Sequence, residues 1–162
     1  MTIRLMIIDD HDLVRAGLEQ YFKMHPGVEV VAEASNGEEL LKKLETSRVD
    51  VLLLDMIMPG LCGVGLIKQV KHLYPGLHIL MLSAHDEAQL VLEAIRAGAS
   101  GYVSKMSTQQ TLCEAINDVM ANGKYISQNI VDRLEYASDS TATDIELFEV
   151  EENFAHIELQ EQ

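Results

Sequence analysis

The feature that most constrains the fold is a regular alternation of short apolar segments with amphipathic ones. Strand-like apolar segments begin near residues 3, 28, 51, 77 and 101, and a segment with helical spacing of apolar residues follows each of them. A repeat of roughly two dozen residues is typical of a βα unit. Consecutive βα units join parallel strands through right-handed crossovers. The sequence therefore predicts an α/β fold with a doubly wound, five-stranded parallel sheet.

The most apolar of these segments ends in a carboxylate. Residues 51–54 read Val-Leu-Leu-Leu, Asp55 follows, and Pro59 and Gly60 indicate a tight loop. In an open α/β sheet, ligands bind in the crevice beyond the carboxyl ends of the strands. Asp55 is therefore a candidate for chemistry, although a solvated aspartate at the end of a strand is an equally simple interpretation.

Polar residues also follow the other predicted strands. Asp9 and Asp10 come after the first strand, Ser83 ends the fourth, and Lys105 follows the fifth. Three carboxylates in one crevice repel one another, and a hard divalent cation such as Mg²⁺ would neutralise them. A hydroxyl and an ammonium group supply a hydrogen-bond donor and a positive charge to a phosphoryl group. This set favours transfer of phosphate to a carboxylate, since aspartate is a known nucleophile for acyl phosphates.

Each of these residues also has a simpler explanation. Asp9 and Asp10 could be acids at a helix entry, Lys105 an ordinary surface lysine, and Ser83 one of many strand-end serines. His11 could indicate a transition-metal site, but a single histidine without a partner is more typical of a surface residue or of one that supports the ligands. Their common position at the strand ends favours the functional interpretation.

Composition excludes several classes of protein. A chain of 162 residues suits one domain with some excess. No apolar run approaches the roughly 20 residues that span a bilayer, and the amino terminus shows no signal-peptide pattern, so we expect a cytoplasmic protein without a membrane partner. Two cysteines are too few for a disulfide framework. The net charge is -14, and residues 137–162 contain no Lys or Arg, which argues against direct binding of nucleic acid.

Several motifs together resemble the receiver domain of two-component response regulators, over about residues 1–123. The motifs are Asp9-Asp10, Asp55 with Met58-Pro59-Gly60, Ser83-Ala84, and Gly101-Tyr102-Val103-Ser104-Lys105. Asp9-Asp10-His11 and the segment 98–102 further resemble the NarL/FixJ branch, with its LuxR-type, GacA-like regulators. The resemblance implies a flavodoxin-like (CheY-like) sheet with strand order 2-1-3-4-5.

The resemblance also implies a role for each site residue. Asp55 would accept a phosphoryl group from a sensor histidine kinase or a phosphotransfer protein. Mg²⁺ would be held by Asp9, Asp10, Asp55 and the backbone carbonyl of Ile57. Lys105 and Ser83 would bind the phosphoryl oxygens, and Tyr102 would follow Ser83 in a conformational switch.

Some positions depart from the common pattern of this family. Met106 follows Lys105 where many receivers have proline. Ile57 and His85 occupy positions that tune dephosphorylation, and because the Ile57 side chain cannot hydrogen-bond an attacking water, we expect a long-lived phosphoryl state. A haloacid-dehalogenase-like phosphatase would need an aspartate at position 57. We therefore expect no enzyme beyond Mg²⁺-dependent self-phosphorylation and dephosphorylation.

The predicted organisation is a receiver domain at 1–123, an extension helix at 124–136 and an acidic linker or tail at 137–162. NarL/FixJ regulators usually continue into a helix-turn-helix domain, which this sequence lacks. Two alternatives remain open: part of a DNA-binding regulator that acts through a missing output domain, with a possible homodimer on phosphorylation, or a stand-alone receiver that signals by protein contact.

Overall fold

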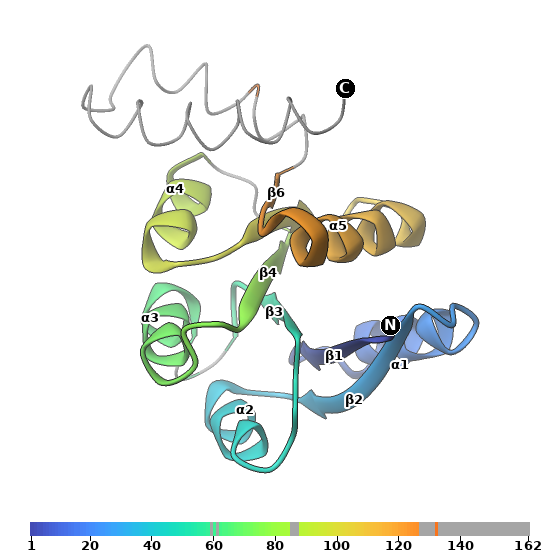
Figure 1. Cartoon of the computed structure of the whole chain (residues 1–162). Helices are drawn as coiled ribbons and strands as arrows, with labels where there is room; N and C mark the ends of the chain where they lie inside the picture. Colours follow the sequence, from blue (N-terminus) through green and yellow to red (C-terminus); the bar gives the residue numbers. More distant parts are fainter. Residues whose placement is uncertain (59, 61, 85–87, 127–131, 133–162) are drawn as a thin grey trace.

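The protein forms one parallel sheet covered by helices on both faces (Figure 1). The computed structural model describes residues 1–58, 60, 62–84, 88–126 and 132. The strands are β1 (Ile3–Ile8), β2 (Val28–Ala34), β3 (Val51–Asp55), β4 (His78–Ser83), β5 (Gly101–Ser104) and β6 (Tyr125–Ile126). The helices are α1 (Asp12–Lys23), α2 (Gly37–Leu44), α3 (Gly63–Leu73), α4 (Ala88–Ala97) and α5 (Gln109–Asn122).

The strand order is β2-β1-β3-β4-β5-β6, and every neighbouring pair is parallel. The predicted order 2-1-3-4-5 is therefore confirmed, and the short strand β6 is added beyond β5. Residues 125 and 126 were expected to belong to an extension helix over 124–136, but they pair with Gly101 and Tyr102 instead. The rest of that expected helix, apart from Lys124 and Asp132, and the acidic segment 137–162 lie outside the described residues.

Alternate residues of the central strands feed two separate hydrophobic cores. In β3, Leu52 and Leu54 point into a core shared with α2, α3 and α4, whereas Val51 and Leu53 point into a core shared with α1 and α5. All five residues of β3 are buried. The strand is continuously apolar because both of its faces are covered, which explains why it lacks the polar alternation of a half-exposed strand.

Glycine at position 101 permits the sixth strand. A Cβ built there would lie 2.1 Å from the backbone carbonyl oxygen of Tyr125, far inside van der Waals contact. The Tyr125 amide donates to the Ser100 carbonyl oxygen over 3.0 Å and helps to fix the strand. The close pairing of β6 with β5 therefore requires a residue without a side chain at the start of β5.

The helix caps agree with the sequence in one place and differ in another. Asn36 and Glu39 have the spacing of a capping box in the sequence, and the side chain of Asn36 indeed accepts a hydrogen bond from the Glu39 amide over 2.8 Å and caps α2. From the sequence, Ser107 and Gln110 have the spacing of a capping box for α5, but this interpretation is wrong, because Thr108 caps the helix by accepting from the Thr111 amide over 3.1 Å. Asp86, which the sequence offers as a cap for α4, lies outside the described residues.

Candidate functional site: an acidic pocket at the carboxyl edge of the sheet

The strand ladder itself places the predicted site residues. Asp9 directly follows β1, and its amide donates to the Ala34 carbonyl oxygen of β2 over 3.1 Å. Lys105 directly follows β5, and its amide donates to the Ser83 carbonyl oxygen over 2.9 Å. Asp55 is the last residue of β3. Because parallel strands end at the same edge, these side chains meet, as the sequence predicts.

One ammonium group holds two buried carboxylates. Lys105 Nζ lies 3.1 Å from Asp9 Oδ2 and 3.2 Å from Asp55 Oδ2. Asp9 is 1% exposed and Asp55 is 3% exposed, so neither carboxylate has free access to water. Two negative charges and one positive charge leave the centre of the pocket with a net negative charge.

The loop between β1 and α1 adds a second set of donors. The backbone amide of His11 donates to Asp9 Oδ1 over 2.8 Å, and the His11 ring Nδ1 lies 2.9 Å from the same oxygen and 3.2 Å from Asp10 Oδ1. Arg15 reaches back from α1 to the Asp9 carbonyl oxygen and to the Asp12 carboxylate. The loop is therefore fixed around Asp9 from both sides.

The pocket shifts the acid strengths of its members in opposite directions. Burial tends to raise the pKa of Asp9, but hydrogen bonds from His11 and the positive charge of Lys105 outweigh it, so this pKa lies below its ordinary value. Burial and the neighbouring charge of Asp9 raise the pKa of Asp55. Burial opposes the charge of Lys105, but the two carboxylates outweigh it and raise its pKa. At neutral pH the ammonium group therefore stays protonated.

The loop after β3 also contacts the pocket. The backbone amide of Ile57 donates to Asp55 Oδ1 over 3.3 Å, while the Ile57 side chain is 50% exposed at the rim. Gly60 and Gly63 have φ values of 79° and 57°, in the left-handed region that favours glycine. These two glycines let the chain turn sharply from the end of β3 into α3.

The two predicted switch residues are both buried. Ser83 is 1% exposed at the end of β4, in register with Ser104. Tyr102 is fully buried in the core that also contains Val91 and Ala94 of α4. The Ser83 side of the pocket and the packing of α4 are thus connected through neighbouring positions of β4 and β5. His85, the other predicted tuning position, lies outside the described residues.

The acidic cluster fits a hard divalent cation. Among the described residues, Asp9, Asp10, His11 and Asp55 each offer a ligand atom, and all of these atoms lie within 4.8 Å of one another. Asp9 Oδ2 is buried and accepts no well-aligned hydrogen bond, so Lys105 neutralises it only as an ion-pair partner. Oxygen atoms that crowd together with a surplus of negative charge suit Mg²⁺.

Sequence reasoning missed two contributors to the site. It gave His11 only a supporting or surface place, whereas its ring contacts both acids that follow β1. It assigned no role to Arg15, although the spacing from Asp12 to Arg15 is that of a helical ion pair and could have indicated one.

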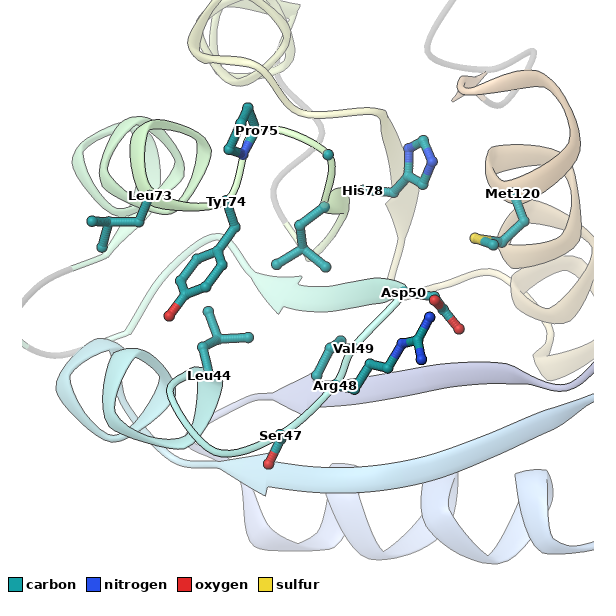
Figure 2. A pocket seen from close by; sticks show the side chains of 12 residues that line it. Leu44, Ser47, Arg48, Val49, Asp50, Leu73, Tyr74, Pro75, His78 and Met120 are labelled. Carbon is teal, nitrogen blue, oxygen red and sulfur yellow. The ribbon is translucent and has the colours of Figure 1, made fainter.

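A cavity of about 520 Å³ lies at the opposite, amino-terminal edge of the sheet (Figure 2). Two of its polar groups have partners: the Asp50 carboxylate accepts a hydrogen bond from the Arg4 amide over 2.8 Å, and His78 Nδ1 lies 3.4 Å from Ser100 Oγ. Burial lowers the pKa of His78, which favours the neutral ring. In the described part of the chain, no helix has the length and apolar character of a membrane span.

Sequence comparison identifies relatives of this chain. The family described as "Response regulator receiver domain" matches residues 5–117. Response regulator UvrY of Escherichia coli (strain K12) is 37% identical over 132 residues, which cover 82% of this chain and 61% of that protein. Response regulator GacA of Pseudomonas viridiflava is 34% identical over 136 residues, which cover 84% and 64%. The chain spans about three fifths of the length of these curated relatives.

Solved structures agree with the sequence match. A LuxR-family two-component response regulator from Aurantimonas sp. SI85-9A1 superimposes with a TM-score of 0.80 at 30% identity and covers 86% of this chain and 100% of that one. The isolated REC domain of RcsB from Salmonella enterica serovar Typhimurium, in the presence of phosphomimetic BeF3-, gives a TM-score of 0.77 at 25% identity, with 83% and 99% covered. With the matching fold and the acidic pocket at its carboxyl edge, this chain belongs to the receiver-domain family of two-component response regulators.

Proposed function

We propose that Asp55 accepts a phosphoryl group and that the receiver domain then changes conformation to control an output. The observation that carries this proposal is the contact of Lys105 Nζ with both Asp9 and Asp55 at the bottom of a buried acidic pocket. A carboxylate that is dehydrated and paired with a cation is positioned to bind a phosphoryl group whose oxygens the same cation attracts.

The transfer itself needs little from the protein beyond position and charge. A carboxylate oxygen of Asp55 attacks phosphorus, an O–P bond forms, and the bond from phosphorus to the donor breaks with its electron pair on the leaving group. Lys105 then stabilises the negative charge of the phosphoryl oxygens. The Ile57 amide, which donates to Asp55 Oδ1 over 3.3 Å, restricts the rotation of the nucleophile.

Mg²⁺ is the cofactor we propose for this transfer. Asp9, Asp10 and Asp55 would hold it, together with the backbone carbonyl of Ile57. When bound, the ion neutralises the carboxylates and the phosphoryl oxygens, which would otherwise repel each other. Asp9 keeps its negative charge at neutral pH because its pKa is lowered.

The switch would run from β4 to α4. Ser83 would donate its hydroxyl hydrogen to a phosphoryl oxygen, and Tyr102 would move with it. Tyr102 is fully buried in the core of α4, so any change in its position has to change the packing of that helix. A local change of charge at Asp55 would thereby alter the surface of the protein around α4.

We also propose the place of this domain in a signalling chain. The phosphodonor would be a sensor histidine kinase or a phosphotransfer protein, and the location cytoplasmic. Because UvrY and GacA extend well beyond the matched region, control of transcription through a DNA-binding output domain is favoured over a stand-alone receiver. A solved relative is described as two RcsB dimers bound to two parallel DNAs, which supports a homodimer as the active form here.

Intact-protein mass spectrometry tests the central step. With acetyl phosphate and Mg²⁺, we expect the wild-type chain to gain the mass of one phosphoryl group, and we expect EDTA to prevent the gain. Asp55→Asn should gain none, whereas Glu38→Gln, which alters an exposed acid in α2, should behave as wild type. A stable adduct on Asp55→Asn would move the phosphoryl group to another residue. This chain alone should also show no sequence-selective binding of duplex DNA in a shift assay.

A further inference from the structure

His11 makes two contacts with one carboxylate oxygen of Asp9, which is unusual for an exposed histidine. Its backbone amide and its ring Nδ1 both reach the same oxygen, Asp9 Oδ1, over 2.8 and 2.9 Å. A carboxylate oxygen only accepts hydrogen bonds, and both oxygens near Nδ1 belong to carboxylates. Nδ1 must therefore carry a hydrogen, whatever the state of the other ring nitrogen.

The ring owes its position to the acids rather than to packing. The side chain of His11 is 63% exposed, while that of Asp9 is 1% exposed. The same Nδ1 lies 3.2 Å from Asp10 Oδ1, so one N–H group bridges the buried acid and the acid at the rim. This bridge sets the spacing between Asp9 and Asp10.

The two carboxylate oxygens of Asp9 therefore have different partners. Oδ1 is saturated by the two donors of His11, which fix the plane of the carboxylate. Oδ2 is buried, accepts no well-aligned hydrogen bond and lies 3.1 Å from Lys105 Nζ. Oδ2 is therefore the Asp9 oxygen that remains available to a cation, and it faces Lys105 and, beyond it, Asp55.

We infer that His11 is a positioning residue for the divalent cation: its ring N–H orients Asp9 and spaces it from Asp10, so that the acids bind the ion without first reorganising. The inference rests on the proposed function, since it concerns the same acidic pocket. Groups that hydrogen-bond a metal-binding carboxylate typically contribute 10–100-fold to metal affinity.

Two substitutions separate the N–H group from the rest of the ring. His11→Leu keeps an apolar side chain of similar reach but removes the donor. His11→Asn restores an N–H donor on the atom that corresponds to Nδ1, and it cannot ionise. His72→Leu makes the same chemical change on the exposed side of α3, away from the pocket, and serves as the control.

Calorimetric titration of the full 162-residue chain with Mg²⁺, without phosphodonor, gives the direct readout. We expect His11→Leu to weaken Mg²⁺ binding about tenfold, and we expect His11→Asn and His72→Leu to bind within about twofold of wild type. In EDTA the urea unfolding of His11→Leu should remain a single cooperative transition, which shows that the variant is folded when Mg²⁺ binding is measured. The phosphorylation rate of His11→Leu should return to the wild-type rate at saturating Mg²⁺.

Each outcome is decisive. If His11→Leu binds Mg²⁺ as well as wild type or more tightly, the ring does not help the ion to bind and the inference fails. The same holds if His11→Asn is as weak as His11→Leu, or if wild type binds no Mg²⁺. If instead wild type binds Mg²⁺ and His11→Leu binds it weakly, but acetyl phosphate leaves Asp55 unmodified, the positioning role stands and the proposed phosphoryl transfer fails.

Discussion

Asp9 and Asp55 share a single counter-ion: Lys105 Nζ lies 3.1 Å from an oxygen of the first and 3.2 Å from an oxygen of the second. The two carboxylates nevertheless differ in acidity. Burial would raise the pKa of Asp9, but hydrogen bonds from His11 and the positive charge of Lys105 outweigh it and lower this pKa, while burial and the charge of Asp9 raise the pKa of Asp55. The pocket thus stabilises Asp9 as an anion, and the charge of Asp9 in turn makes Asp55 harder to ionise.

The two acids should respond oppositely to neutralisation. A raised folded-state pKa means that ionised Asp55 costs stability once the pH exceeds its unfolded value, so Asp55→Asn should raise the free energy of unfolding at pH 7 in EDTA. A lowered pKa means that Asp9 contributes stability that is lost as the pH falls, so Asp9→Asn should lower the free energy of unfolding at pH 7, and the difference should shrink in acid. Urea unfolding across this pH range checks both signs, and equal effects would refute the assignment.

Removal of Lys105 should lower the free energy of unfolding, because Asp9 and Asp55 then repel each other without a counter-ion. Lys105→Met leaves two buried carboxylates without a counter-ion, and we expect a loss of about 3 kcal/mol in the free energy of unfolding. Mg²⁺ should restore more stability to this variant than it gives to wild type, because the ion replaces the missing positive charge. Lys42→Met, an exposed change in α2, should stay within about 0.5 kcal/mol of wild type. A Mg²⁺ response no greater than that of wild type would argue against a cation site.

Ile57 should determine the lifetime of the phosphoryl group. Its side chain is 50% exposed at the rim of the pocket and offers no hydrogen bond to an attacking water. Ile57→Asn supplies such a group and should shorten the lifetime, whereas Ile57→Val should not. Decay of the phosphoryl adduct, followed by mass spectrometry after removal of the phosphodonor, gives both rates. An unchanged lifetime in Ile57→Asn would remove the side chain from this role.

Gly101 should be essential for the sixth strand. A methyl group there meets the Tyr125 carbonyl oxygen at 2.1 Å, so Gly101→Ala should cost about 2 kcal/mol and speed hydrogen exchange at the Tyr125 amide. Gly17→Ala is the matched control, because nothing lies within 4 Å of its added Cβ. Within helix α1 this control should stabilise the protein by about 0.5–1 kcal/mol.

Glu39 should titrate far below an ordinary glutamate. Hydrogen bonds from Lys43 and Ser35 lower the pKa of Glu39 to about 2. Because this pKa is depressed on folding, the contribution of Glu39 to stability is present above its ordinary value of 4.5 and is lost as the pH falls towards about 2. Carboxyl NMR shifts of Glu39 should show the low midpoint, and Ser35→Ala should move it upward. A midpoint near 4.5 in wild type would contradict the hydrogen-bond network.

The apolar run at 51–54 predicted a buried strand correctly, because a strand covered on both faces needs no polar alternation. The site followed from the same logic: parallel strands end at one edge, so Asp9, Asp55 and Lys105 came together, and Ser83 lies buried at the same edge. This grouping can be predicted without knowing the conformation of any loop. Local capping was less certain, since Ser107 and Thr108 are chemically similar, and only the path of the backbone chose Thr108.

The sequence by itself determined the order of the βα units, the two-sided core and the set of groups at the carboxyl edge, because hydrophobic periodicity and strand direction are local properties. Tertiary structure alone decided which oxygen of Asp9 meets His11 and which meets Lys105, and that Tyr125 pairs with β5 instead of starting a helix. The contacts of Lys105 and Tyr125 join segments far apart in the chain, whereas the His11 contact is local and depends on the conformation of the loop between β1 and α1. A two-residue strand or a single ring hydrogen bond is too weak to be specified until the packed sheet holds its partner in place.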